Sequence, residues 1–100
     1  TDMGGMFNET TSFNQDINSW DVSNVTNMSA MFRETTSFNQ DIGSWDVSNV
    51  TIMGNMFFRA VAFNQDLSSW DVNAVTYCGF FSIAASAWTE SKPNFTNCGE

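Results

Sequence analysis

The chain has 100 residues, of which 42% are hydrophobic and 15% aromatic, and this is too apolar for a disordered chain. Its formal net charge of −8 makes nucleic acid and anionic membrane surfaces poor partners. It contains no His, which removes the usual general base and the commonest metal ligand, and its two cysteines are too few for a zinc cage. No stretch approaches the roughly 20 apolar residues of a membrane span.

A period of 25 residues organises the sequence. The stretch 37–51 occurs almost unchanged at 12–26, with Asn18 in place of Gly43, and again with more drift at 62–76. A strict period of this length predicts a stack of equivalent coils. We expect a single domain over 1–100, with a partial repeat 1–12, repeats at 13–37, 38–62 and 63–87, and a C-terminal cap at 88–100.

When the chain is aligned on this period, large apolar residues fall into columns with one member in each repeat. A single coil cannot bury these side chains, but stacked coils can, because each covers its neighbour. The columns are Phe13, Phe38, Phe63 and Trp88; Ile17, Ile42 and Leu67; Trp20, Trp45, Trp70 and Phe95; Val22, Val47 and Val72; Val25, Val50 and Val75; Met3, Met28, Met53 and Cys78; Met6, Met31, Met56 and Phe81; and Phe7, Phe32 and Phe57.

Within each repeat, the local pattern predicts extended pieces followed by a short helix. Segments such as 15–17 and 20–22, separated by a turn at 18–19, are expected to pair between coils as a narrow parallel sheet, with about 4.8 Å between coils. Val25, Met28 and Phe32 have the i, i+3, i+7 spacing of a helix, and Ser23 precedes them as an N-cap. The predicted fold class is a leucine-rich-repeat-like repeat solenoid. Each coil would contribute short parallel strands and one short helix, in about four coils with a C-terminal cap.

The repeat itself resembles that of a known family. Its pattern is Phe-Asn-Gln-Asp-Ile-x-x-Trp-Asp-Val-Ser-x-Val-Thr-x-Met-x-x-Met-Phe, and it starts at Phe13, Phe38 and Phe63. This is similar to the 25-residue repeat of BspA-like leucine-rich-repeat surface proteins, which is also described in mycoplasma lipoproteins. The resemblance covers roughly residues 1–81. It implies a cell-surface protein involved in adhesion and in binding host or matrix proteins, and it implies no catalytic residues.

The last repeat departs from the pattern. Lys92 occupies the Ile17 column and Asn97 the Val22 column, and polar residues there suit a terminal cap. Cys78 and Cys98 are predicted to form a disulfide that ties this cap down, which would place the protein in an oxidising compartment. Closing a loop of about 20 residues would contribute roughly 3 kcal/mol. The alternative is two buried thiols.

The first residues suggest an interface. Residues 1–7 align with 26–32, so the chain begins in mid-coil without a polar cap. An uncovered apolar face of this kind marks an interface or an aggregation liability. We expect upstream repeats or another copy of the chain to stack there. The predicted stacking residues are Met3, Met6, Phe7 and Phe13.

Three sets of polar residues also recur at the period. Asp16, Asp41 and Asp66 form one acidic column, and Asp21, Asp46 and Asp71 form another. Calcium bound by these carboxylates is one interpretation. Hydrogen bonds from turn backbone or neighbouring Ser are the favoured one, and we expect no cofactor. Asn14, Asn39 and Asn64 are predicted to form a hydrogen-bonded ladder.

Several Asn residues begin an Asn-x-Ser/Thr triplet, the acceptor sequence for N-linked glycans in a eukaryotic secreted protein. An Asn- and Thr-rich repeat also creates such triplets by chance. The candidates are Asn8, Asn24, Asn27, Asn49 and Asn94.

The sequence favours a non-enzymatic function, because its candidate carboxylate pairs recur in every coil whereas active sites are unique. The first hypothesis is an extracellular or cell-surface structural protein, a surface or filament component assembled by end-to-end stacking of coils. The alternative is an adhesion module that recognises a protein or glycan through its repeated exposed face.

Overall fold

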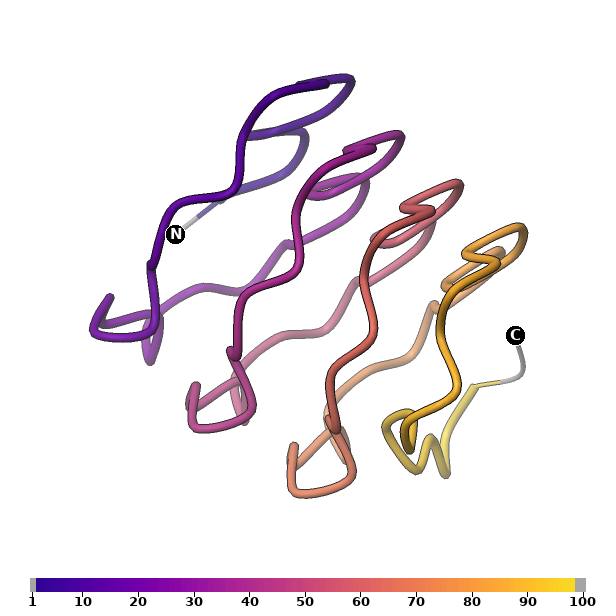
Figure 1. Ribbon diagram of the computed structural model, residues 1–100. Coiled ribbons are helices and arrows are strands. Elements are labelled where there is room, and N and C mark those ends of the chain that lie inside the picture. Colours follow the sequence, from indigo (N-terminus) through magenta and orange to yellow (C-terminus); the bar gives the residue numbers. More distant parts are fainter. Residues whose placement is uncertain (1, 99–100) are drawn as a thin grey trace.

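The computed structural model describes residues 2–98, and the backbone follows successive 25-residue circuits that lie side by side (Figure 1). We call the stretches 2–25, 26–50, 51–75 and 76–98 windings 1 to 4. Thr1, Gly99 and Glu100 lie outside the described residues. The outermost ends of the predicted partial repeat 1–12 and of the predicted cap 88–100 are therefore not described.

Backbone hydrogen bonds join each winding to the next. Isolated parallel bridges pair Asp2 with Asn27, Asn27 with Ile52, and Ile52 with Tyr77. Beside these bridges, N–H groups at alternate positions donate to the following winding. The pairs in windings 1 and 2 are Met3 N to Asn27 O, Gly5 N to Ser29 O, Phe7 N to Met31 O and Glu9 N to Arg33 O, at 2.8–2.9 Å.

The predicted short helices do not form, and residues 2–98 contain no helix. In place of the helix expected near 25–32, three overlapping four-residue turns follow one another, and in the middle one Arg33 N donates to Ala30 O at 3.3 Å. The N–H of Met31 donates to Met28 O, and the N–H of Thr35 donates to Phe32 O, both at 3.2 Å. The apolar spacing that suggested a helix is also compatible with consecutive turns, because such turns bring Met28, Met31 and Phe32 to the same side. The turns leave alternate N–H groups available to donate to the next winding. A helix would instead pair these N–H groups with its own carbonyls.

The predicted strands at 15–17 and 20–22 are also wrong, since the only β-pairing among the described residues is the column of isolated bridges at Asp2, Asn27, Ile52 and Tyr77. Side chains occupy the backbone groups that a sheet would pair. The Ile17 carbonyl accepts the indole N–H of Trp45 at 3.1 Å. The N–H of Asn39 donates to the Asn14 side chain at 2.8 Å.

The fold class expected from the sequence is therefore corrected. The chain is not a leucine-rich-repeat-like solenoid with strands and a helix in every coil. The described residues form a compact body of 30 × 26 × 21 Å with a Cα radius of gyration of 11.9 Å. Single backbone hydrogen bonds and side-chain ladders, in place of regular secondary structure, hold its windings together.

The core is a set of buried apolar columns that runs through the windings. Side chains from every predicted column are buried, among them Ile42, Val50 and Met53 at 0% exposure. The aromatic rings stack along the columns, with 5.3 Å between the ring centroids of Phe32 and Phe57 at an interplanar angle of 13°. The predicted apolar core is thus confirmed for the inner windings, where each ring has neighbours on both sides.

Two columns of residues adopt a left-handed backbone conformation. Gly5, Ala30, Asn55 and Phe80, one in each winding, all have φ between 57° and 68°. A second column four residues later, Glu9, Glu34, Arg59 and Ala84, has φ between 56° and 63°. This left-handed region costs a non-glycine residue roughly 1–2 kcal/mol. In windings 1 to 3 the N–H of each of these residues donates to the next winding.

Ala30→Gly is expected to raise the free energy of unfolding by about 0.5–1 kcal/mol. Glycine already occupies this column at Gly5, and it carries no Cβ to be strained at the φ of 57° seen for Ala30. Thermal or denaturant unfolding would measure the change. Ala74→Gly is the control, because Ala74 has no positive φ and the change should lower stability by a similar amount. If both variants lose stability equally, backbone strain at Ala30 is not significant.

Candidate interaction surfaces

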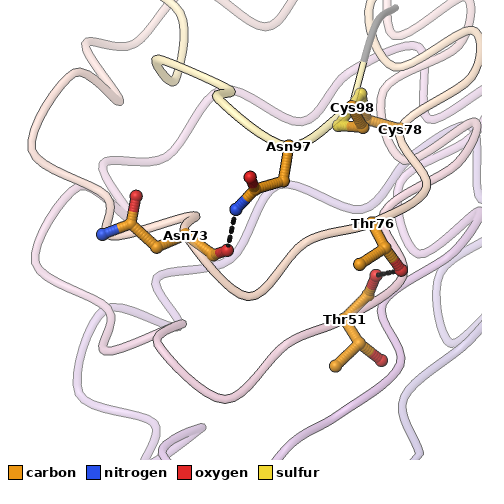
Figure 2. Close-up of a disulfide and its surroundings, with 6 residues drawn as sticks. All are labelled: Thr51, Asn73, Thr76, Cys78, Asn97 and Cys98. Carbon is orange, nitrogen blue, oxygen red and sulfur yellow. Dashed lines mark hydrogen bonds between the residues drawn. A yellow bond between two sulfur atoms is a disulfide. The ribbon is translucent and has the colours of Figure 1, made fainter.

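The C-terminal end of the body is tied down by a disulfide. Cys78, which is fully buried, bonds to Cys98, and their Cα atoms lie 6.1 Å apart (Figure 2). Next to it, the amide of Asn97 donates to the Asn73 carbonyl at 2.5 Å. Thr76 bonds to Thr51 O through both its N–H and its hydroxyl. These contacts hold the last residues across windings 3 and 4. Disulfides of this kind are typical of proteins from oxidising environments.

The opposite end exposes apolar side chains that are buried in later windings. Met6 is 46% exposed, whereas Met31 and Met56 in the same column are fully buried. Met3, Phe7 and Phe13 are half-buried, and they pack against the core from one side only. The four predicted stacking residues therefore lie together at this end. Trp20 joins them, with its ring 5.8 Å from that of Phe7.

The two ends also differ in their backbone hydrogen-bonding groups. Inside the body, Ala30 N donates to Gly54 O and Glu34 N donates to Phe58 O, and the same columns repeat in windings 1 and 3. At the first winding the equivalent acceptors are the carbonyls of Gly4 and Asn8, which accept from no described residue. At the last winding the equivalent donors are the N–H groups of Phe80 and Ala84, which donate to no described residue. One end thus presents acceptors and the other presents donors.

Charge is distributed unevenly between the ends. Residues 1–25 contain four Asp or Glu and no Lys or Arg, a net of −4, whereas residues 76–100 contain two Glu and one Lys, a net of −1. Asp2, Glu9, Asp16 and Asp21 are all exposed. Two copies meeting first winding to first winding would bring like charges together. A first winding meeting a last winding would bring together much less like charge.

The two acidic columns are engaged in local hydrogen bonds. Each carboxylate accepts the backbone N–H of the residue two positions later, as in Ser23 to Asp21 at 3.0 Å and Gly43 to Asp41 at 2.9 Å. Donation from the hydroxyl and then from the N–H of the Ser two residues on lowers the pKa of Asp21, Asp46 and Asp66 below its usual value. Within residues 2–98, no three His, Cys, Asp or Glu side chains gather as a metal site would require.

A shallow polar hollow of about 370 Å³ lies between windings 2 and 3, over the turn after the first acidic column. Asp41, Ser44, Gln65, Asp66 and Ser69 line it. Asp41 and Asp66 already accept N–H groups there, from Gly43 and Ser68 at 2.9 Å. The hydroxyl of Ser69 donates to Gly43 O. The side chains of this hollow are therefore occupied in holding the turns.

The Asn ladder predicted from the sequence is confirmed. The Asn14 side chain accepts from Asn39 N, and the Asn39 side chain accepts from Asn64 N, both at 2.8 Å. The ladder continues to Thr89 N at 2.7 Å. Its members are exposed or half-buried, so it runs along the surface of the body and joins all four windings.

The candidate glycan acceptors differ in their surroundings. Asn8, Asn24, Asn49 and Asn94 are exposed, and Asn27 is half-buried. The amide nitrogen of Asn49 is engaged, since it donates to Ser23 O at 2.7 Å. The side-chain oxygens of Asn8 and Asn27 accept from Arg33 and from Ser29 N. Glycosylation of these residues stays a prediction.

One exposed apolar surface was not predicted. We call Ile52, Phe58, Tyr77, Phe80 and Ile83 the aromatic patch. Tyr77 and Phe80 are 53% and 57% exposed, and the rings of Phe58 and Phe80 meet edge to face at 6.4 Å. The signal that could have revealed it is a change of chemistry within columns. In the column of Tyr77 the polar Asp2 and Asn27 give way to Ile52, and in the column of Phe80 the earlier members are Gly5, Ala30 and Asn55.

These features define a repeat protein with a 25-residue period, an aromatic core and polar side-chain ladders. Residues 1–95 match the family model described as "Mycoplasma protein of unknown function, DUF285", and the chain belongs to that family. Comparison with curated proteins and with solved structures gave no match.

No helix among residues 2–98 is long and apolar enough to cross a membrane.

Proposed function

We propose that the protein is a non-enzymatic extracellular structural component that assembles by head-to-tail stacking, with winding 1 of one copy against winding 4 of the next. The observation that carries this proposal is the match between the two ends. Gly4 O and Asn8 O lie in the columns that accept between windings, and Phe80 N and Ala84 N lie in the columns that donate. A second copy placed in register would continue both columns.

Backbone conformation supports the same arrangement. Phe80 and Ala84 keep positive φ angles of 57° and 62°, although no described residue accepts their N–H groups. Strained backbone of this kind persists where the surrounding structure or function requires it. In windings 1 to 3 the same conformation always accompanies a hydrogen bond to the next winding. The last winding is therefore already shaped to donate to a further one.

Apolar contacts and charge favour the same polarity. Head-to-tail stacking would cover Met6 and Phe7, as Met31 and Phe32 are covered within the chain. It would also bring winding 1, whose net charge is −4, against residues 76–100, whose net charge is −1, whereas head-to-head contact would join two windings of −4. The resemblance of the repeat to BspA-like surface proteins, together with the disulfide, supports an extracellular location.

Met6→Glu is expected to abolish this association. A carboxylate at the 46% exposed Met6 would have to be desolvated in the contact, and it would add to the negative charge of winding 1. Sedimentation velocity of the wild type should show species that grow with concentration, and electron microscopy should show linear particles. The variant should remain monomeric.

The matched control is Val61→Glu. Val61 lies in winding 3 and is 40% exposed although it has windings on both sides, so it faces sideways and not along the stack. This variant should assemble as the wild type does. A wild type that stays monomeric at every concentration would overturn the proposal, and so would Val61→Glu and Met6→Glu losing assembly equally.

A further inference from the structure

The aromatic patch differs from the end faces in position and in construction. Its most exposed members, Tyr77 and Phe80, belong to winding 4, but they lie in columns that face sideways. Ile52, in the same column as Tyr77, is 37% exposed despite having a winding on each side. Head-to-tail stacking would therefore leave this patch open to solvent.

Two glycines hold the Tyr77 ring flat against the body. A Cβ at Gly54 would lie 2.7 Å from Cδ2 of Tyr77 and closer still to Cε2, and a Cβ at Gly79 would lie 2.8 Å from its hydroxyl oxygen. The ring therefore rests on the backbone of both glycines. The two glycines support the ring from the side of the body, and Tyr77 is nevertheless 53% exposed. The result is a flat aromatic platform on the surface.

The size of the patch limits what it can bind. Aromatic side chains present about 150–250 Å² each, so the exposed fractions of Tyr77 and Phe80 correspond to on the order of 100 Å² for each ring. With Ile52 and Ile83 the patch approaches about 400 Å², half of the roughly 800 Å² that each partner buries in a stable protein interface. A second protein would need further surface, whereas a small ligand with one apolar face would not.

The charges around the patch favour a neutral ligand. Arg33 and Arg59 lie over the Phe58 ring, with guanidinium carbons 5.5 and 5.2 Å from its centroid. Arg33 is paired with Glu9 at 3.4 Å and with Glu34 at 2.9 Å. The surroundings are therefore close to neutral, in a chain whose net charge of −8 repels anions. The arginines also supply N–H donors at the rim, and the side chain of Asn55 lies in the same column as Phe80.

We propose that Tyr77 is the platform of a binding site for a neutral sugar, a hexopyranose whose axial C–H groups stack on the open ring face. The C–H bonds on that face of a pyranose carry partial positive charge, and the face of an aromatic ring is electron-rich. Phe80 extends the platform to a second sugar unit, and the polar rim accepts and donates hydrogen bonds to ring hydroxyls. The site occurs once in the chain, so it differs from recognition through a repeated face.

Saturation-transfer-difference NMR with the full chain tests the site, with cellohexaose as the probe and maltohexaose as a second neutral glucan. Saturation of the Tyr77 ring protons should appear on the sugar C–H protons. Tyr77→Ala should weaken binding on the order of tenfold, the loss of one stacking contact, and Tyr77→Phe should preserve it. Gly54→Ala should also weaken binding, because its Cβ displaces the ring without removing it.

The control is Trp20→Ala, which removes an exposed aromatic residue at the stacking end and should leave sugar binding unchanged. Folding of each variant is checked by its unfolding midpoint. Binding that survives Tyr77→Ala, or no transfer from Tyr77 to either glucan, would overturn the site while leaving head-to-tail stacking untouched. Loss of stacking in Met6→Glu with sugar binding retained would separate the two proposals.

Discussion

Phe57→Ala should lower the free energy of unfolding by about 3–5 kcal/mol. The Phe57 ring is fully buried, and its centroid lies 4.4 Å from that of Phe63, 5.1 Å from Trp88 and 5.3 Å from Phe32. Removing the ring leaves a cavity between neighbouring windings. The cavity cannot collapse fully, because backbone hydrogen bonds fix the distance between the windings. Single domains are stable by only about 5–15 kcal/mol, so this loss is a large part of the total. Guanidinium unfolding followed by Trp fluorescence measures it.

Phe7→Ala is the matched control for this change. Phe7 belongs to the same column, but it is half-buried and has a neighbouring winding on one side only. We expect about half the loss seen at Phe57, because less buried surface and a smaller cavity are involved. Equal losses in a dilute, monomeric sample would contradict the view that position in the stack sets the cost.

Replacing both Cys78 and Cys98, as in a Cys78→Ala, Cys98→Ser variant, should lower the free energy of unfolding by about 3 kcal/mol. The bond closes a loop across a sequence separation of 20, and opening it restores conformational entropy to the unfolded chain. The midpoint of denaturant unfolding should fall. Reducing the wild-type protein with a phosphine should produce a similar shift.

The position of the disulfide predicts where its loss acts first. Among the described residues, the hydrogen bonds from residues 96–97 to winding 3 are side-chain bonds to Asn73, from Thr96 at 3.3 Å and from Asn97 at 2.5 Å. Without the disulfide, amide exchange should rise in residues 93–98 before it rises in windings 2 and 3. A uniform rise across all windings, or an unchanged unfolding midpoint after reduction, would contradict this account.

The columns were predictable because burial depends on period alone once a strict repeat is present. Ile42, Trp45, Val47 and Val50, which the sequence assigned to the core, are all at most 4% exposed. The Asn ladder was predictable for the same reason, since identical side chains at identical positions must meet. The predicted repeat boundaries stay a prediction, because the hydrogen bonds run continuously from one winding to the next.

The absence of the helix was not predictable from the spacing of apolar residues, because a two-turn apolar pattern does not distinguish a helix from consecutive turns. Ser29 N donates to the Asn27 side chain at 2.9 Å, and this local bond competes with helix initiation. Ala30 and Glu34 also adopt a left-handed φ that sequence preferences disfavour. Bonds to the neighbouring winding outweigh both preferences, and those bonds exist only in the folded stack.

The 25-residue period, the buried columns of the inner windings and the polar side chains that meet in ladders can all be derived from the amino-acid sequence. These features follow from periodicity, since each repeat sees the same neighbours. The lack of helices and strands in the windings, the left-handed φ of Phe80 and Ala84, and the contact of the Tyr77 ring with Gly54 and Gly79 are visible only in the tertiary structure. These depend on where each N–H group and each ring points, and contacts between windings fix those directions.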